Sequence, residues 1–184
     1  MTEPELTREI RDQRIAICQD VLERLQLRAL HLKRNHTYCA STTLKEHYNI
    51  AEFRGIDAQE CVDDLESECQ ICADGALLLS TLRLYNGMPM DDMLNVSGHV
   101  HVSSTLLESR LGPIFGLRML RAFEAVFEHV MPSTTGFSAP ERWALKQFGH
   151  FFAAPEAALE VMCRHVIEHD GDLVIADLKV PAAT

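Results

Sequence analysis

Residues 76–84 read Ala-Leu-Leu-Leu-Ser-Thr-Leu-Arg-Leu, and this stretch decides the fold that we expect. If the stretch is helical, apolar side chains lie on nearly every side of the helix. Such a helix must be surrounded by other elements, because almost none of its surface suits contact with water. The stretch therefore predicts a central buried helix within a helical domain.

Helical patterns also occur on both sides of the central stretch. In these segments apolar side chains recur at helical spacing, or a capping residue and a proline mark a helix start. In chain order the predicted helices are residues 5–30, residues 57–85 (which include the central stretch, with a break near Cys69 left open), residues 114–131, a short helix from Ser138 to about Phe148, and a last helix from Pro155 to a stop at Gly171.

We therefore predict a mainly α protein, a single helical domain of five to six helices over residues 1–184 with at most a small β element. Residues 86–113 are expected to form a long connection, because Gly112-Pro113 is a typical break before the next helix. The N-terminal helix, within residues 1–35, is expected either to pack on the domain or to project from it. Short β segments are predicted within residues 37–43, 96–103 and 173–176.

The composition is that of a globular protein with an acidic charge balance. The 184 residues contain 17 Lys and Arg against 27 Asp and Glu, a formal net charge of −10, and 47% of them are hydrophobic. The hydrophobic share is typical of a folded domain, and the negative charge disfavours general nucleic-acid binding. No apolar run is long enough for a membrane span, and the N-terminus lacks a signal region. We therefore expect a cytoplasmic protein with reduced cysteines and no membrane partner.

The negative charge is concentrated in one short segment. Residues 55–82 contain seven acidic side chains and no lysine or arginine: Asp57, Glu60, Asp63, Asp64, Glu66, Glu68 and Asp74. These side chains form either an ordinary solvated helix face or a docking surface for a basic partner, including mimicry of nucleic acid.

Our leading hypothesis is a non-enzymatic protein-interaction or regulatory factor. Its acidic helix face, residues 57–68, would bind a protein partner, and self-association as a homodimer is left open. The residues predicted to contact the partner are Glu60, Asp63, Asp64, Glu66 and Glu68.

A first alternative is a metal-dependent enzyme that uses zinc. Cys69-Gln-Ile-Cys72 supplies half of a common zinc site, and His99-Val-His101 supplies two further donors. The competing interpretation places Cys61, Cys69 and Cys72 as small hydrophobic residues on one stripe of a helix. We assign no cofactor, and zinc stays as the alternative.

A second metal candidate is His165-Val-Ile-Glu168-His169, which matches the H-x-x-E-H motif. In metalloproteases with this motif the two histidines bind zinc and the glutamate acts as the base. No glutamate follows His169 to serve as a third ligand, and histidines at a helix end also suit the helix dipole. We assign no catalytic residue. A looser set of metal-capable side chains comprises His31, His36, Cys39 and His47.

A further alternative is a helical nucleic-acid binder. The one locally basic stretch contains Arg24, Arg28, Lys33 and Arg34, although cations at the end of a helix are also favoured by its dipole. Met88, Met90 and Met93 would form an adaptable binding surface if exposed, but we expect them to fill gaps in the core.

Three segments resemble an uncharacterised family of small phage, prophage and bacterial proteins. They are residues 72–86 (Cys-Ala-Asp-Gly-Ala-Leu-Leu-Leu-Ser-Thr-Leu-Arg-Leu-Tyr-Asn), residues 122–128 (Ala-Phe-Glu-Ala-Val-Phe-Glu) and residues 166–171 (Val-Ile-Glu-His-Asp-Gly). The resemblance implies a small intracellular accessory protein rather than a metabolic enzyme. It implies no catalytic residue.

Overall fold

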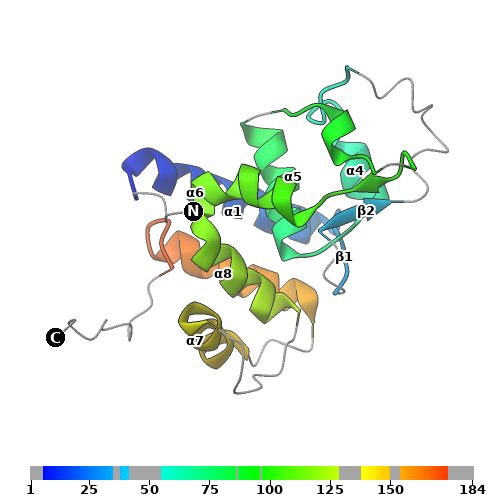
Figure 1. The fold of residues 1–184 in the computed structure, drawn as a ribbon. Helices are drawn as coiled ribbons and strands as arrows, with labels where there is room; N and C mark the ends of the chain where they lie inside the picture. The colour runs from blue at the N-terminus through cyan, green and yellow to red at the C-terminus, as the bar shows by residue number, and fades with distance from the viewer. Residues whose placement is uncertain are drawn as a thin grey trace.

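The computed structural model describes residues 6–34, 38–41, 55–85, 87–95, 97–128, 138–149 and 154–173. These residues form a mainly helical structure with a small sheet (Figure 1), which confirms the predicted fold class. The elements are α1 (Arg8–Leu27), β1 (His31–Leu32), β2 (Cys39–Ser41), α4 (Val62–Glu68), β3 (Gln70–Ile71), α5 (Ala73–Leu84), the 3-10 helix η1 (Met90–Met93), β4 (Val100–His101), α6 (Ser104–Phe127), α7 (Ala139–Phe148) and α8 (Pro155–Glu168). None of these described helices combines the length and apolar character needed to cross a membrane.

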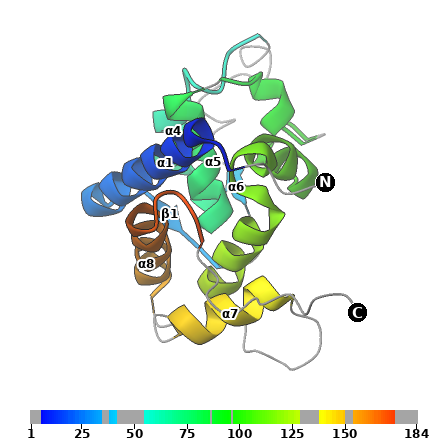
Figure 2. The ribbon, with the colours of Figure 1, turned by 90° about the vertical axis from the view of Figure 1, so that its left-hand side faces the viewer.

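The helix α5 lies at the centre of the core, as its apolar sequence predicts. Every residue from Ala73 to Leu82 is buried, and the helix packs against both α1 and α6. The helix α8 lies along α1, and α7 packs against α6 (Figure 2). The two views place α4 and α7 at opposite ends of the molecule.

A sheet of four very short strands lies beside α4. Its strand order is β1-β3-β2-β4, with β1 parallel to β3 and the other neighbours antiparallel. The chain entering β2 approaches α5 so closely that a Cβ on Gly75 would lie 1.6 Å from the Tyr38 carbonyl oxygen. Glycine is therefore required at this position of α5.

Two of the three predicted β segments contain strands. β2 lies within residues 37–43 and β4 lies within residues 96–103. Thr37, residues 42–43, Val96 and residues 174–176 lie outside the part of the chain that the structure describes.

The predicted helical segment 57–85 is broken near Cys69, the alternative left open by the sequence, and forms two helices, α4 and α5, with β3 between them. At Cys69 the backbone is extended, with φ −90° and ψ 141°, so the helix ends there. The predicted stripe of cysteines on one continuous helix is therefore wrong, although Cys61, Cys69 and Cys72 are all buried.

The connection after α5 is shorter than the predicted 86–113. It contains η1 and β4. The helix α6 begins at Ser104, after Ser103, whose side chain accepts a hydrogen bond from the Leu106 N–H at 3.2 Å.

The predicted break at Gly112-Pro113 is wrong, because the chain leaves helical geometry only at Gly116, with φ 73° and ψ 152°. Proline disturbs the turn that precedes it, and a glycine with positive φ then forms the kink.

The methionines of this connection are part of the core. Met88, Met90 and Met93 are each no more than 1% exposed. The expectation that they fill gaps in the core is confirmed.

The N-terminal helix packs on the domain and does not project from it. Ile17, Cys18 and Val21 are fully buried where α1 meets α5 and α8. The helix starts after Thr7, whose Oγ1 accepts a hydrogen bond from the Ile10 N–H at 3.3 Å. Because α1 packs into the core, its polar residues Arg14 and Asp20 are buried inside the protein.

Arg14 is the most deeply buried cation of α1, and it binds the kink of α6. Its Nε donates to the Ile114 carbonyl oxygen at 2.7 Å, and its Nη2 donates to the Phe115 carbonyl oxygen at 3.3 Å. Its Nη1 donates to the Gly171 carbonyl oxygen at 3.0 Å. Carbonyl groups next to a kink lose helical donors, so Arg14 compensates for the interruption of α6.

Candidate functional site

The structure divides the predicted acidic face into an outward part and an inward part. Glu60 and Glu68 are exposed and Asp64 is half-buried. Asp64 and Glu68 are four residues apart on α4, a spacing that places side chains on the same face of a helix, and Glu60 lies in the turn that leads into α4. We call Glu60, Asp64 and Glu68 the outer carboxylate row.

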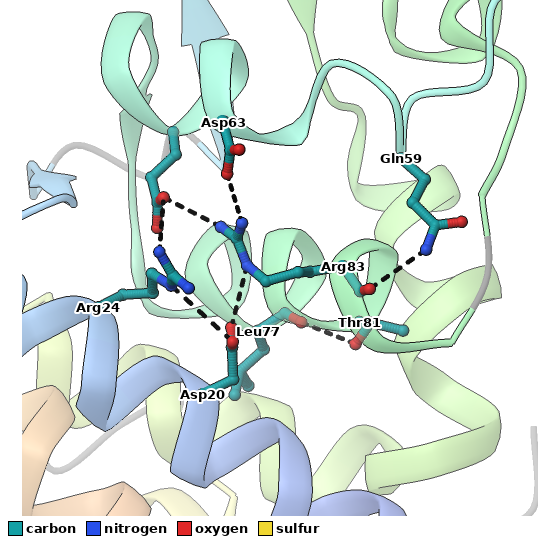
Figure 3. Close-up of polar contacts among 8 residues, drawn as sticks. Asp20, Arg24, Gln59, Asp63, Leu77, Thr81 and Arg83 are labelled. Carbon is teal, nitrogen blue, oxygen red and sulfur yellow. Dashed lines mark hydrogen bonds and ion pairs between the residues drawn. The ribbon is translucent and has the colours of Figure 1, made fainter.

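Glu66 does not belong to the outward face, contrary to the prediction. Only 6% of its side chain is exposed, and its Oε2 accepts a hydrogen bond from Arg83 Nη2 at 3.0 Å. Asp63 is exposed, but its Oδ1 accepts a hydrogen bond from Arg83 Nη1 at 2.6 Å. Because α4 packs against α5, Arg83 of α5 reaches both the buried Glu66 and the exposed Asp63, whose contact with Arg83 is drawn in Figure 3.

The helix α1 supplies two further residues, Asp20 and Arg24, to this group of ion pairs. Asp20 Oδ2 lies 3.4 Å from Arg83 Nε, and Asp20 Oδ1 lies 3.9 Å from Arg24 Nε. Arg24 Nη1 lies 3.8 Å from Glu66 Oε2. We call Asp20, Arg24, Glu66 and Arg83 the buried ion cluster, and it joins α1, α4 and α5 (Figure 3).

Burial dominates the electrostatics of Glu66. Its removal from water raises the pKa of its carboxyl group, and the nearby Arg83 and Arg24 only partly oppose that rise. Desolvation therefore acts against the charged form of Glu66, whereas the ion pairs with Arg83 and Arg24 favour it. The cluster fixes the position of α4 on the core.

A polar hollow of about 400 Å³ lies beside the end of α4. Lys33 Nζ donates a hydrogen bond to Gln70 Oε1 at 2.7 Å, which links the two walls of the hollow. Glu68 lines the hollow and also belongs to the outer carboxylate row, so the two features form one surface. The lining residues are His31, Leu32, Lys33, Ser67, Glu68, Cys69 and Gln70.

The predicted zinc donors do not meet at one point. Cys69 lies beside Cys39, with which it shares a hydrogen bond. In the sheet Cys39 pairs with Ile71, whereas its neighbour Ala40 pairs with His101. Because successive strand residues face opposite sides, His101 lies on the side of the sheet away from Cys39. His101 is exposed, whereas Cys69 and Cys72 are buried and His99 is half-buried.

The same conclusion holds for every metal candidate within the described ranges. No group of three or more His, Cys, Asp or Glu side chains is placed there to hold a metal ion. His31 lines the hollow and Cys39 is in the core. His36 and His47 lie outside the described residues.

The H-x-x-E-H segment forms an aromatic cluster. The His165 and His169 rings stack with their centroids 3.9 Å apart, and His165 also contacts Trp143 and Phe148 edge-on or tilted, at 5.6 and 5.1 Å. Burial lowers the pKa of His165, with a smaller contribution from His169. Glu168 is exposed on α8. These two histidines therefore help to pack α8 against α7.

The basic stretch is used largely within the protein. Arg24 belongs to the buried ion cluster, Lys33 binds Gln70, and Arg34 Nε donates to the Phe127 carbonyl oxygen at 2.7 Å. Arg28 is exposed and ends α1 in the left-handed region, with φ 54°. Three of the four predicted phosphate-binding cations are therefore already bound to other groups of the chain.

All six thiols are buried, and two pairs of them interact. Cys39 shares a hydrogen bond with Cys69, and Cys163 shares one with Cys18. Burial and the neighbouring thiol both raise the pKa of Cys163. A buried thiol with a raised pKa is a poor nucleophile.

We therefore expect all six native thiols to react with an aromatic disulfide reagent at least about a thousandfold more slowly than in the urea-unfolded chain, because reaction requires opening of the fold. Absorbance of the released aromatic thiol measures the rate. A Ser97→Cys variant, at an exposed position, is the control and should react at once. Fast reaction of any native thiol in the unmodified protein would contradict the burial described.

Asp74 is the deepest acid of the charged segment. It is 2% exposed in the first turn of α5, and its Oδ1 has no hydrogen-bond partner among the described residues. Burial raises the pKa of its carboxyl group well above the usual range, and the nearby Glu124 and Glu128 raise it further. The core therefore favours the neutral acid at this position.

Asp74→Asn should remove a pH dependence of stability. The folded protein holds the Asp74 proton more tightly than the unfolded chain, so its free energy of unfolding should fall as pH rises above the ordinary aspartate pKa of about 3.9. The variant should match the wild type below that pH and exceed it by about 1 kcal/mol or more at pH 8. Urea unfolding of both proteins between these limits tests this. If the free energy of unfolding changes with pH in the same way in both proteins, or if the variant is less stable than the wild type at pH 8, Asp74 is held as a charged group.

Two central residues of the buried ion cluster, Asp20 and Arg83, were missed by the sequence reasoning. The available signal was Arg83, a single cation in an otherwise apolar stretch. A buried arginine requires carboxylate or carbonyl partners, and Arg83 has three acidic ones.

No protein-family model matches this sequence, and comparisons with curated proteins and with solved structures also give no match. The resemblance to small phage and bacterial proteins stays a prediction.

Proposed function

We propose that this protein is a non-enzymatic interaction factor that binds a basic segment of a protein partner. The binding surface consists of the outer carboxylate row and the adjacent hollow. The observation that carries the proposal is the outer carboxylate row, in and just before α4, within a stretch of residues 55–82 that contains no lysine or arginine.

The distribution of cations supports this assignment. Arg83 and Arg24 approach the buried Glu66 from other elements, and Arg83 also binds the exposed Asp63. Asp64 and Glu68 lie one turn apart on α4 and Glu60 lies in the turn before it, so the row places three negative charges along this segment. The negative charge of the row would attract a cationic partner.

The hollow adds polar groups and a concave shape to the charged binding surface. Ser67 and Gln70 supply polar groups, and β1 is the edge strand of the sheet. A side chain of the partner can enter the hollow while its basic groups lie along the row. Such a combination of charge and shape gives specificity, whereas charge alone mainly accelerates encounter.

Loss of the row should weaken binding without harming the fold. The probe is a synthetic helical peptide with a lysine at every fourth position, and the measurement is titration calorimetry at low salt. We expect the variant E60Q/D64N/E68Q to bind about tenfold more weakly, because each exposed pair contributes up to roughly 1 kcal/mol. Wild-type affinity should also fall as salt screens the exposed charges.

The matched control removes three charges elsewhere. E23Q/D91N/D92N alters three exposed acids outside α4 and should bind within about twofold of the wild type, because only local charges contact the peptide. Equal loss in both variants would indicate a general effect of net charge and would contradict the proposal. A row variant that unfolds more easily than the wild type would show instead that the row is structural.

No described feature gives comparable support to a zinc enzyme or to a nucleic-acid binder. The metal donors within the described residues are separated, and most of the basic stretch is engaged with other groups of the chain.

A further inference from the structure

A second hollow, of about 270 Å³, lies where α1, α5 and α6 meet. It is distinct from the acidic surface, since the two share no lining residue. Its apolar wall consists of Leu78 and Leu82 from α5 and of Pro113 and Ile114 from α6. An apolar cavity of about 150 Å³ holds a benzene molecule, so this hollow has room for a ring or a short aliphatic chain with a head group.

Three polar side chains converge on the hollow from three different helices. They are Gln13 of α1, Tyr85 directly after α5 and Arg110 of α6. Within the described residues, none of the three has a hydrogen bond or an ion pair. The other hydroxyl groups of the lining differ, because Thr81 and Ser109 already donate to carbonyl oxygens of their own helices at 2.7 Å.

Arg110 favours a negatively charged ligand in this hollow. Arg110 is half-buried. In the buried ion cluster the two half-buried arginines, Arg24 and Arg83, are both paired with carboxylates. A half-buried guanidinium beside an apolar wall favours an anion that forms charge-assisted hydrogen bonds with it.

The kink of α6 shapes this wall. Pro113 has no N–H to donate to the Ser109 carbonyl group one turn earlier, and both residues line the hollow. Burial and the Asp12 carboxylate raise the pKa of Tyr85, so its hydroxyl group stays a neutral donor. Tyr85 and the adjacent Leu84 are also exposed, at 37% and 40%, which extends the apolar surface to the rim.

We propose that the hollow between α1, α5 and α6 is a binding site for a small amphipathic carboxylate. The apolar body of the ligand lies against Leu78, Leu82 and Ile114, and its carboxylate accepts hydrogen bonds from Arg110. A few convergent polar groups around an apolar wall are the usual composition of a small-molecule site. The inference stands independently of the acidic surface.

Octanoate is the probe, and heteronuclear NMR of the full chain is the measurement. We expect saturable binding of one octanoate with a Kd on the order of 1 mM or tighter, with the largest shifts in the hollow. Octanol has the same apolar chain without the charge, and it should bind about tenfold more weakly.

Variants separate this site from nonspecific uptake. Arg110→Gln should weaken octanoate binding about tenfold and abolish the preference over octanol. Arg121→Gln removes an exposed arginine from the same helix and should bind as the wild type does. Ser109→Trp should block the hollow and abolish binding of both probes, and E60Q/D64N/E68Q should bind octanoate normally.

Three results would overturn the proposal. The first is the absence of saturable octanoate binding, and the second is equal affinity of the wild type and Arg110→Gln. The third is a concentration-dependent dimer in sedimentation that Tyr85→Ser dissociates, since the hollow would then be covered by a second copy of the chain.

Discussion

Arg83→Ala is expected to lower the free energy of unfolding by about 3–5 kcal/mol, because it leaves buried carboxylates without their main cation. Arg83 contacts Asp20, Asp63 and Glu66, and two of these side chains are less than a tenth exposed. Arg24 is the remaining cation, and its contacts at 3.8 and 3.9 Å are too long to replace those of Arg83. Urea unfolding followed by circular dichroism gives the change directly.

Two controls identify the source of this loss. Asp63→Asn removes only the exposed partner and should change the free energy of unfolding by less than about 1 kcal/mol. The double variant E66L/R83M replaces a buried pair with apolar side chains and leaves Asp20 with Arg24. It should regain most of the stability, because removing both charges also removes their desolvation cost. If the double variant is as unstable as Arg83→Ala, lost packing rather than unpaired charge is the cause.

Arg14→Leu is expected to cost about 3 kcal/mol, because it leaves three carbonyl groups at a kink and a turn without their donor. The guanidinium is buried and binds Ile114, Phe115 and Gly171. Amide hydrogen exchange should also accelerate around Gly116, where the interrupted helix loses its support. Chemical unfolding and hydrogen exchange measure the two effects.

Arg11→Leu is the matched control, three residues earlier on the same helix. Arg11 also binds the turn after α8, through the Asp170 carbonyl oxygen and carboxylate at 3.1 and 2.9 Å, but a third of its side chain is exposed. Its loss should therefore cost less than about 1 kcal/mol. Equal effects of the two substitutions would mean that Arg14 does not support the kink.

Much of the helical architecture could be predicted because local patterns determine it. The apolar run of residues 76–84 predicted the buried helix, and Thr7 and Ser138 marked helix starts that the structure contains. The strand β3 could not be predicted, because the two residues Gln70 and Ile71 are too few for a period and are held by tertiary pairing with β1 and β2. The continuation of α6 past Pro113 likewise depends on a tertiary contact, since Arg14 satisfies carbonyl groups at the kink.

The candidate site shows the same limit. Counting charges located the acidic segment, but it treated Glu66 and Glu68 alike. The fold distinguishes them, because Glu66 is buried within ion-pair distance of Arg83 and Arg24, whereas Glu68 is exposed. A sequence pattern gives the face of a helix, whereas the partner of each side chain depends on contacts made across the fold.

The central claim is that the outer carboxylate row and its hollow bind a basic protein segment. Nuclear magnetic resonance titration with the lysine peptide tests it most directly, because each backbone amide reports its own contact. We predict saturable shifts in Glu60, Asp64, Glu68 and the hollow residues Lys33 and Gln70, with little change at Asp91 and Asp92. Shifts of equal size at Asp91 and Asp92, or no saturable shift on α4, would contradict the account.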